Sequence, residues 1–302
     1  MLVEMCVRRG TGDNMGSAQK VKEYLKRFDR SLSGYLFFRK LETLTDELLG
    51  KKKPIASHDY YAFKNAFNFY KAEELEEVVL HYMPDRKVRL ALELVKGAYG
   101  EGKRTSGNTR VSHVLRVAMM AAAFGEGKNV VIAGLLHDIV EDALAGKAVC
   151  PYWDGTGGKE EMLKVIGEIF GLRVAQLVGI LTDDGKDYPN YLRMVYLDPD
   201  AAKLKKIDKI VNLWELDNIE NMDDRMEKVE KTLEKSRYQI MCELPGGING
   251  VGIALEGILH QAFWEVENWS MELAKGKRDT PLQENGALQG SKSLLGHPPP
   301  HD

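Results

Sequence analysis

Residues 133–142 place four ionisable side chains inside a segment that otherwise has the composition of a buried helix. These side chains are His137, Asp138, Glu141 and Asp142. The apolar positions around them are Val130, Val131, Ile132, Leu135, Leu136, Ile139 and Val140. Burying four polar groups against this face without partners would cost several kcal/mol. The segment therefore predicts an apolar helix whose polar groups bind a cation or carry out acid–base chemistry.

The spacing of these groups places them in two adjacent rows. His137 and Glu141 are four residues apart, as are Asp138 and Asp142, and this spacing stacks side chains on a helix surface. Adjacent residues such as His137 and Asp138 leave a helix about 100° apart. Both reach one ion only in a cleft lined by several helices, so we expect further ligands from neighbouring helices.

Composition and charge exclude several classes of protein. The 302 residues are 44% hydrophobic and 29% charged, which is ordinary for a globular protein. A formal net charge of −3 gives no overall attraction to nucleic acid, so we expect no nucleic-acid partner and favour a small ligand bound by a local basic patch. Three scattered cysteines do not form a disulfide framework. No segment approaches the roughly 18 apolar residues of a membrane span, so we expect a cytoplasmic protein that does not bind membranes.

Helical periodicity and turn residues predict an all-α fold, with no convincing strand alternation or internal repeat. We expect helices at about 17–30, 35–50, 58–83, 85–99, 111–124, 128–143, 159–170, 173–181, 190–197, 200–219, 222–242 and 252–274. Residues 1–86 are predicted to be a leader and helical extension, and residues 87–274 a helical bundle. The joint at Gly246–Gly252 is expected to be an interhelical loop, and residues 275–302 have too little apolar surface to fold and are predicted to be a disordered tail.

Two further segments can supply ligands. A basic loop at residues 103–110 precedes His113 at the start of an apolar helix, and Asp208 shares a helix face with Asn212. Alone, His113 is more often a surface or helix-terminal histidine, and Asp208 among lysines is more often half of an ion pair. Together with residues 133–142 they give a His2Asp2 set, which suits Mn²⁺, Fe²⁺ or Zn²⁺ rather than Ca²⁺.

The order of these motifs resembles the HD-superfamily metal-dependent phosphohydrolases, and within them the RelA/SpoT-type (p)ppGpp 3′-pyrophosphohydrolase domain. The resemblance runs over about residues 88–219. It rests on four segments: Arg104-Thr105-Ser106-Gly107 before His113, Leu135-Leu136-His137-Asp138-Ile139-Val140-Glu141-Asp142, Phe170-Gly171-Leu172-Arg173-Val174-Ala175-Gln176-Leu177-Val178 leading to Thr182, and Asp208-Lys209-Ile210-Val211-Asn212.

The resemblance implies roles for particular residues. The implied ligands of Mn²⁺, or of another divalent transition metal, are His113, His137, Asp138 and Asp208. Glu141 and Asp142 are the implied pair that orients and deprotonates the attacking water. The implied substrate-binding residues are Lys103, Arg104, Ser106 and Asn212. The planar guanidinium of Arg104 is suited to stacking on a purine, while Lys103 and Ser106 are suited to phosphate oxygens.

The chain departs from the family pattern at several positions. Arg110 stands where the family usually has Tyr, Val114 where it has Pro, and Val211 where it has His. We expect these changes to affect the substrate pocket more than the metal site. Residues 143–158 have the character of an insertion, whose Tyr152 and Trp153 either stack on a base or, as the commoner arrangement, pack the loop.

The expected activity is metal-dependent hydrolysis of guanosine 3′-diphosphate alarmones (ppGpp and pppGpp) with release of pyrophosphate, as in the stringent response. The first alternative is an HD phosphohydrolase acting on another nucleotide, which Arg110 and Val114 favour. The second is a nucleotide-sensing protein without turnover, in which the helices before residue 87 bind a protein partner. Intact Glu141 and Asp142 argue against the second alternative, because a binding module does not need both.

Overall fold

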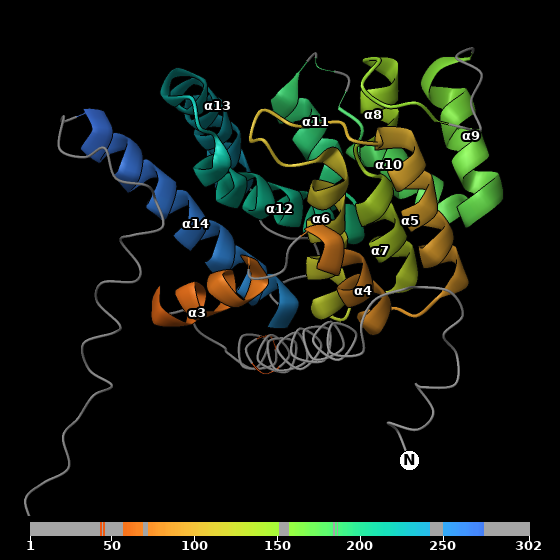
Figure 1. Ribbon diagram of the computed structural model, residues 1–302, viewed down its shortest axis with the longest axis horizontal. Helices are drawn as coiled ribbons and strands as arrows, with labels where there is room; N and C mark the ends of the chain where they lie inside the picture. Colours follow the sequence, from red (N-terminus) through yellow and green to blue (C-terminus); the bar gives the residue numbers. More distant parts are fainter. Residues whose placement is uncertain are drawn as a thin grey trace, which may run out of the picture.

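The computed structural model describes residues 57–68, 72–150, 157–183, 187–241 and 250–274, together with Thr43, Thr45 and Gly185. Every regular element in these ranges is helical, which confirms the expected all-α fold (Figure 1). The helices are α3 (Ser57–Asn68), α4 (Ala72–Tyr82), α5 (Arg86–Tyr99), α6 (Arg110–Ala123), α7 (Lys128–Leu136), α8 (Ile139–Leu144), α9 (Gly158–Phe170), α10 (Leu172–Leu181), α11 (Tyr188–Val195), α12 (Pro199–Trp214), η1 (Glu215–Asn218), α13 (Met222–Met241) and α14 (Gly250–Ala274).

The central helix pair of the bundle is α6 and α7. Helix α6 also packs on α4 and α12, and α7 packs on α5 and α10. In α7 every residue from Val130 to Leu136 is buried, as expected for a helix that is apolar on all sides. A Cβ at Gly134 would lie 3.3 Å from Leu204 Cδ2 and 3.5 Å from Ala118 Cα, so the absent side chain lets α6, α7 and α12 approach closely. Those three helices are the ones that carry the expected ligands.

The basic loop before α6 is closed by local hydrogen bonds. An isolated antiparallel bridge joins Lys103 to Thr109, and Gly107 allows the turn between them with φ of +77°. The Thr109 side chain then caps α6 by accepting a hydrogen bond from Ser112 N. These contacts fix the position of Arg104 relative to the first turn of α6.

The helix expected over residues 128–143 is interrupted at its two most polar positions. Helix α7 ends at Leu136 and α8 begins at Ile139, with His137 and Asp138 between them. Both residues keep right-handed backbone angles, so the interruption is local. The two side chains diverge, as adjacent side chains on a helix do: His137 is buried near Asp208, whereas Asp138 lines the cavity.

Two other expected helices also differ from the structure. Residues 58–83 form α3 and α4 rather than one helix, and the two pack on different neighbours, α14 and α6. The helix expected over residues 200–219 is α-helical only to Trp214 and continues as the tighter 3₁₀ turn η1. Such a turn is common at the end of an α-helix, and here it places Glu215 in the interior.

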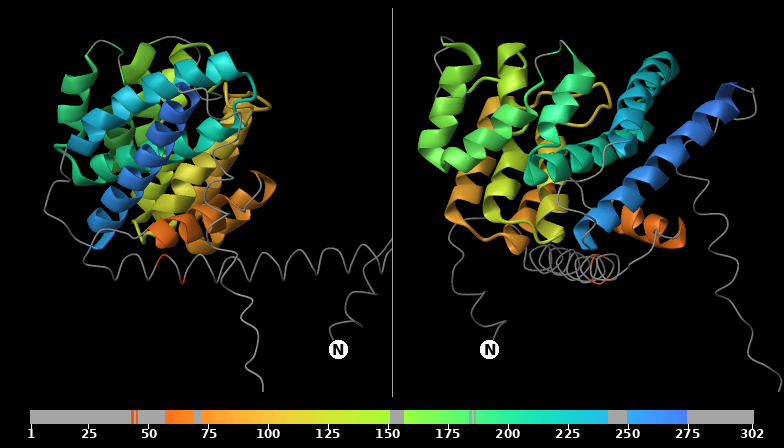
Figure 2. Two further views of the ribbon diagram at one scale, coloured as in Figure 1. Left: turned by 90° about the vertical axis from the view of Figure 1, so that its left-hand side faces the viewer. Right: turned by 180° about the vertical axis from the view of Figure 1, so that it is seen from behind.

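Helices α13 and α14 lie at one end of the bundle and α9 lies at the other (Figures 1 and 2). Helix α14 packs on α3, α12 and α13. Within the described ranges, no helix is long and apolar enough to cross a membrane. The expected helices at 17–30 and over most of 35–50, the first part of the Gly246–Gly252 joint, Tyr152 and Trp153 of the 143–158 segment, and the 275–302 segment lie outside the described residues.

Candidate metal and phosphate site

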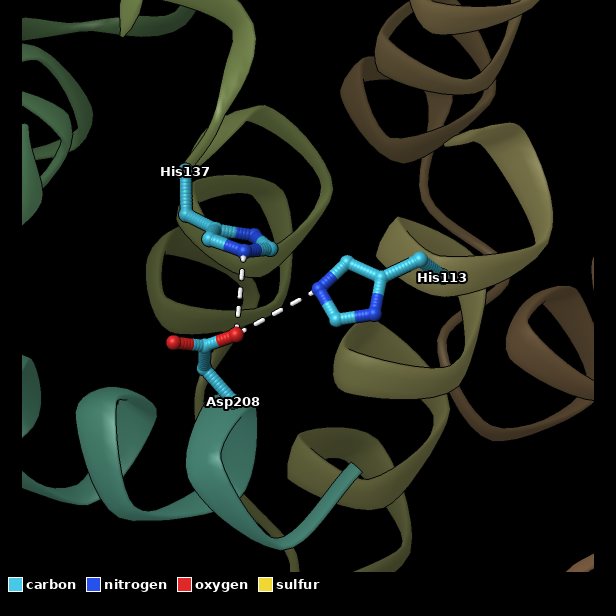
Figure 3. A group of neighbouring side chains, drawn as sticks. All are labelled: His113, His137 and Asp208. Atoms are coloured by element: carbon cyan, nitrogen blue, oxygen red, sulfur yellow. Dashed lines mark ion pairs between the residues drawn. The ribbon is translucent and has the colours of Figure 1, made fainter. Parts of the chain in front are cut away.

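Three buried side chains from three helices converge on one point (Figure 3). His113 comes from α6, His137 follows α7, and Asp208 comes from α12. The Oδ1 atom of Asp208 lies 3.3 Å from His113 Nε2 and 3.7 Å from His137 Nε2. Each residue offers a ligand atom within 4.8 Å of the others. We call these three residues the ligand group; they are three of the four metal ligands that the sequence predicts.

Hydrogen bonds on the far side of each ring orient the two imidazoles. His113 Nδ1 lies 3.2 Å from Glu215 Oε2, and His137 Nδ1 donates to Gly134 O at 2.8 Å. When Nδ1 carries the proton, Nε2 keeps its lone pair for a ligand. Both Nε2 atoms are buried, and within the described part of the chain neither has a hydrogen-bond partner. Two orphaned nitrogens facing a carboxylate oxygen fit a divalent cation bound by nitrogen and oxygen ligands.

Asp138, the fourth expected ligand, borders this group. Its Oδ1 lies 3.2 Å from His137 Nε2, and its Oδ2 lies 3.8 Å from His113 Nε2. Oδ2 also lies 3.5 Å from Arg104 Nη1. The carboxylate therefore lies between the two histidines and the basic loop, next to the three converging side chains but not among them.

Neighbouring charges shift the pKa values of Asp208 and His137. Burial raises the pKa of Asp208, but Lys205 and the two histidines outweigh burial and hold that pKa well below its ordinary value. Burial lowers the pKa of His137, but Asp138 and Asp208 outweigh this effect and raise the pKa to about 10. The site therefore stabilises a positive charge next to its carboxylates.

The two expected water-activating carboxylates have different surroundings. Glu141 lines the cavity above the ligand group, and desolvation followed by repulsion from Asp138 raises its pKa. Asp142 instead accepts hydrogen bonds on both carboxylate oxygens from Arg110 Nη1, at 3.2 and 3.1 Å. Lys147 lies 3.9 Å from the same carboxylate. Both acids reach the cavity, but only Asp142 is tied to an arginine.

Arg104 and Asn212 form a bridge from the basic loop to the ligand group. Arg104 Nη2 donates to Asn212 Oδ1 at 2.7 Å, and Asn212 Nδ2 donates to Asp208 Oδ1 at 2.6 Å. Arg104 Nε also lies 3.4 Å from Glu215 Oε2. Asn212 therefore positions Asp208 as well as lining the cavity.

The ligand group lies beside a cavity of about 360 Å³. Its acidic lining residues are Asp138, Glu141, Asp142, Asp183, Asp208 and Glu215. Its basic lining residues are Arg104, Arg110, Lys147, Lys205, Lys209, Lys228, Lys231 and Lys235. We call the five lysines of α12 and α13, namely Lys205, Lys209, Lys228, Lys231 and Lys235, the lysine wall.

Burial and repulsion between cations shift the pKa values of two lysines in the lysine wall. Desolvation lowers the pKa of Lys209 to about 7; Asp208 acts against this, and Lys205, Lys235 and Lys228 add to it. Desolvation, followed by repulsion from Arg104, lowers the pKa of Lys228. An anionic ligand in the cavity would stabilise both the buried Lys209 and the more exposed Lys228.

Ser106 and Lys103, two of the expected substrate-binding residues, lie in different surroundings. Ser106 is buried, lines the cavity, and has an Oγ atom with no hydrogen-bond partner among the described residues. Lys103 is exposed and does not line the cavity, because its bridge to Thr109 places it on the outer strand of the loop. The expectation that Lys103 faces the phosphates is therefore wrong for this structure.

The three residues that depart from the family pattern also lie in different places. Arg110 lines the cavity, as expected. Val114 and Val211 are each 1% exposed and line no part of it, so the expectation that they alter the pocket is wrong. Val211 instead borders a smaller cavity behind Glu215. A branched apolar side chain in that position packs into the core.

Sequence reasoning missed Glu215 and the part of the lysine wall on α13. Glu215 carries no local signal, since it contacts His113 across 102 residues of chain. Lys228, Lys231 and Lys235 did carry one: their spacing of three and then four residues places them on one face of a helix. The lysine face of α13 was therefore predictable from the sequence, but the fact that it lines the same cavity as the ligand group was not.

Comparison with known proteins agrees with this geometry. The family model described as "HD domain" matches residues 110–213, from the first residue of α6 almost to the end of α12. That range contains all four expected ligands. The match covers the three helices that meet at the centre, and it excludes α3, α13 and α14.

Two curated proteins are similar over a longer stretch. A guanosine-3′,5′-bis(diphosphate) 3′-pyrophosphohydrolase of Aquifex aeolicus is 30% identical over 182 residues, covering 57% of this chain and 23% of that protein. A probable guanosine-3′,5′-bis(diphosphate) 3′-pyrophosphohydrolase of Mycoplasma pneumoniae is 24% identical over 201 residues, covering 63% and 27%. The chain thus spans about a quarter of the length of these relatives. Residues 110–213, which carry the convergent His113, His137 and Asp208, are therefore similar to the HD domain, and the chain is similar over a longer stretch to guanosine-bis(diphosphate) pyrophosphohydrolases.

Proposed function

We propose that this chain hydrolyses guanosine 3′-diphosphate alarmones, ppGpp or pppGpp, and releases pyrophosphate. The observation that carries the proposal is the pair of buried, unpartnered Nε2 atoms that face Asp208 Oδ1 beside a basic cavity. This arrangement combines a cation site with a phosphate site. The names of the two curated relatives supply the substrate class.

The proposed cofactor is Mn²⁺, with another divalent transition metal as the alternative. His113, His137, Asp138 and Asp208 would hold it, since two imidazole nitrogens and two carboxylates are a mixed ligand set that such ions accept. A divalent cation in this position lowers the pKa of a water molecule and neutralises charge on a phosphate. Glu215 and Gly134 O would support such a cation indirectly, because their contacts with Nδ1 of His113 and His137 leave each Nε2 free to bind it.

The remaining polar groups then have separate tasks. Glu141 and Asp142 orient the attacking water, and Glu141, whose raised pKa shows a readiness to be protonated, accepts its proton on a carboxylate oxygen. Arg104 and Asn212 position the nucleotide, with Ser106 Oγ donating to it. The water attacks the phosphorus that is bonded to the 3′ oxygen and the bond to that oxygen breaks, so that pyrophosphate forms and the 3′ oxygen leaves, taking up the proton that Glu141 accepted. Fixing both partners in one cavity lowers the entropic cost of the attack.

The lysine wall supports a substrate with more than one phosphate group. Its α12 members lie beside Asp208, with Lys205 Nζ 3.3 Å from Asp208 Oδ2, and its α13 members line the same cavity. A substrate with a pyrophosphate at the metal end and further phosphates elsewhere places negative charge on both sides of the cavity. Lys205, Lys231 and Lys235 already pair with Asp208, Glu227 and Asp183, so further phosphates would add most to the neutralisation of Lys209 and Lys228.

The decisive experiment is a product analysis. The purified protein is incubated with Mn²⁺ and a panel of ppGpp, pppGpp, GTP, GDP, GMP and the adenine counterparts, and released pyrophosphate and orthophosphate are quantified separately. The proposal predicts pyrophosphate from ppGpp and pppGpp, no activity in EDTA, and activity restored by added Mn²⁺. Turnover of another nucleotide only, with orthophosphate released, would favour the HD phosphohydrolase of different substrate, which Arg110 in the cavity makes the leading alternative.

The proposal also covers the cellular location and the domain organisation of the protein. We place it in the cytoplasm, with residues 87–274 as the phosphohydrolase domain and residues 1–86 as an extension that binds a protein partner. Helix α3 of that extension contacts α14 through Tyr60 and Lys64, both of which donate to Glu265. Tight alarmone binding without turnover at saturating Mn²⁺ would instead support a sensor.

A further inference from the structure

Arg110 occupies a position that helix stability alone disfavours. It is the first residue of α6, where the N-terminal end of the helix dipole is positive and a cation costs a few tenths of a kcal/mol or more. Its side chain is nevertheless drawn inward and only 19% exposed. Something in the cavity must therefore stabilise the guanidinium.

That partner is Asp142. One nitrogen, Nη1, reaches both carboxylate oxygens at 3.2 and 3.1 Å, and the Asp142 side chain is 12% exposed. Charge-assisted contacts of this kind in a partly desolvated site are stronger than those between neutral groups. Among the described residues, Nη1 is the only side-chain nitrogen of Arg110 that makes a hydrogen bond.

Asp142 needs such a partner to keep one orientation. Its helix, α8, has only six residues, and the chain turns directly after it. The same end of the cavity also holds the carboxylates of Asp138, Glu141 and Asp208, which repel Asp142. Lys147, the other nearby cation, is farther away and 54% exposed, so it holds Asp142 less firmly.

We propose that Arg110 is a positioning residue, which fixes the carboxylate of Asp142 at the ligand end of the cavity and leaves Glu141 as the free carboxylate of the pair. The inference deepens the proposed function and rests on it for its kinetic consequence. It assigns to Arg110 a task within the reaction, although Arg110 does not itself contact the reacting atoms.

A double-mutant cycle on kcat tests this assignment, with Arg110→Gln, Asp142→Asn and the double variant assayed on ppGpp with Mn²⁺. Arg110→Gln is expected to lower kcat by about 10- to 100-fold and to change KM by less than about threefold. In the Asp142→Asn background the same change is expected to have almost no further effect. Arg110→Lys, which keeps the charge but not the planar shape, is expected to restore part of kcat.

Equal losses in both backgrounds would overturn the proposal, as would a rise in KM with kcat unchanged, because Arg110 would then act on the substrate directly. The cycle is repeated on the thermal unfolding temperature, which needs no substrate. If the wild-type protein hydrolyses no nucleotide in the panel, the proposed function fails, but non-additive unfolding shifts still support the hold of Arg110 on Asp142. Additive shifts would overturn that hold.

Discussion

Glu215 Oε2 lies 3.2 Å from His113 Nδ1, so the first residue of η1 fixes the imidazole ring of His113 on α6. The glutamate side chain is 6% exposed. Burial raises its pKa, but His113 and Arg104 outweigh burial and keep that pKa below its ordinary value. An ionised carboxylate behind an imidazole increases the basicity of the nitrogen that faces the metal.

We expect Glu215→Gln to weaken Mn²⁺ binding by about 10- to 100-fold, because the ring of His113 loses its charged partner. Free Mn²⁺ can be followed by electron paramagnetic resonance during titration. Glu220→Gln, an equal change of charge at an exposed position outside the site, is the control and should leave the affinity unchanged. Equal affinities for wild type and Glu215→Gln would show that Glu215 does not support the ligand.

Removing a ligand should be far more severe. His137→Ala and Asp138→Ala are each expected to lower kcat by about 10³-fold or more, since cation-assisted activation supplies several kcal/mol of the barrier reduction. Far-ultraviolet circular dichroism should show an unchanged helix content, because His137 and Asp138 lie between two helices rather than inside one. Full turnover in either variant would contradict the assignment of the site.

The residues that converge, His113, His137 and Asp208, were predictable because the evidence for them is local. A histidine and an aspartate in an apolar segment conflict with burial, and Asp208 and Asn212 share a helix face, so each motif is visible within a few residues. Glu215 was not predictable, because its partner is on another helix and the 3₁₀ turn that carries it follows an α-helix without a break in periodicity. Contacts of that kind depend on how helices pack.

The interruption at His137 and the outward position of Lys103 have related causes. Periodicity detects the apolar face of residues 128–143 but does not detect two residues unwinding within it, since Asp138 and Asp142 still keep a backbone hydrogen bond of 2.8 Å. In the loop, Lys103 and Arg104 are adjacent and both basic, and the bridge to Thr109 decides which one faces inward. Charge pattern alone cannot distinguish neighbours in a loop.

The lysine wall should contribute binding more than chemistry. Lys228→Ala is expected to raise KM for ppGpp by about tenfold with little change in kcat, because a cation distant from the reacting phosphorus binds substrate and transition state equally. The rise should shrink at high salt. Lys164→Ala on α9, where the lysine pairs with Glu161 away from the cavity, is the matched control. A fall in kcat at constant KM would place Lys228 in the catalytic machinery instead.

Asp217 in η1 is a buried carboxylate that lies outside the candidate site. The Asp217 side chain is 4% exposed, and burial raises its pKa to about 6, although Lys64 Nζ, at 3.9 Å, acts in the opposite direction. The Oδ1 atom has no hydrogen-bond partner among the described residues. The folded protein therefore binds a proton at Asp217 more tightly than the unfolded chain does, and ionisation of Asp217 costs stability.

A group whose pKa is raised in the folded state loses stability as pH rises, here between about pH 4 and pH 6, and the loss is complete above that range. We expect Asp217→Asn to increase the free energy of unfolding at pH 7.5 by about 1 to 3 kcal/mol, since one pKa unit corresponds to 1.36 kcal/mol, and to change it little near pH 4. Urea unfolding at both pH values measures the difference. Glu220→Gln should show no such pH dependence, because its side chain is exposed in both states. An equal effect of Asp217→Asn at the two pH values would mean that the cost of Asp217 is one of packing rather than of charge.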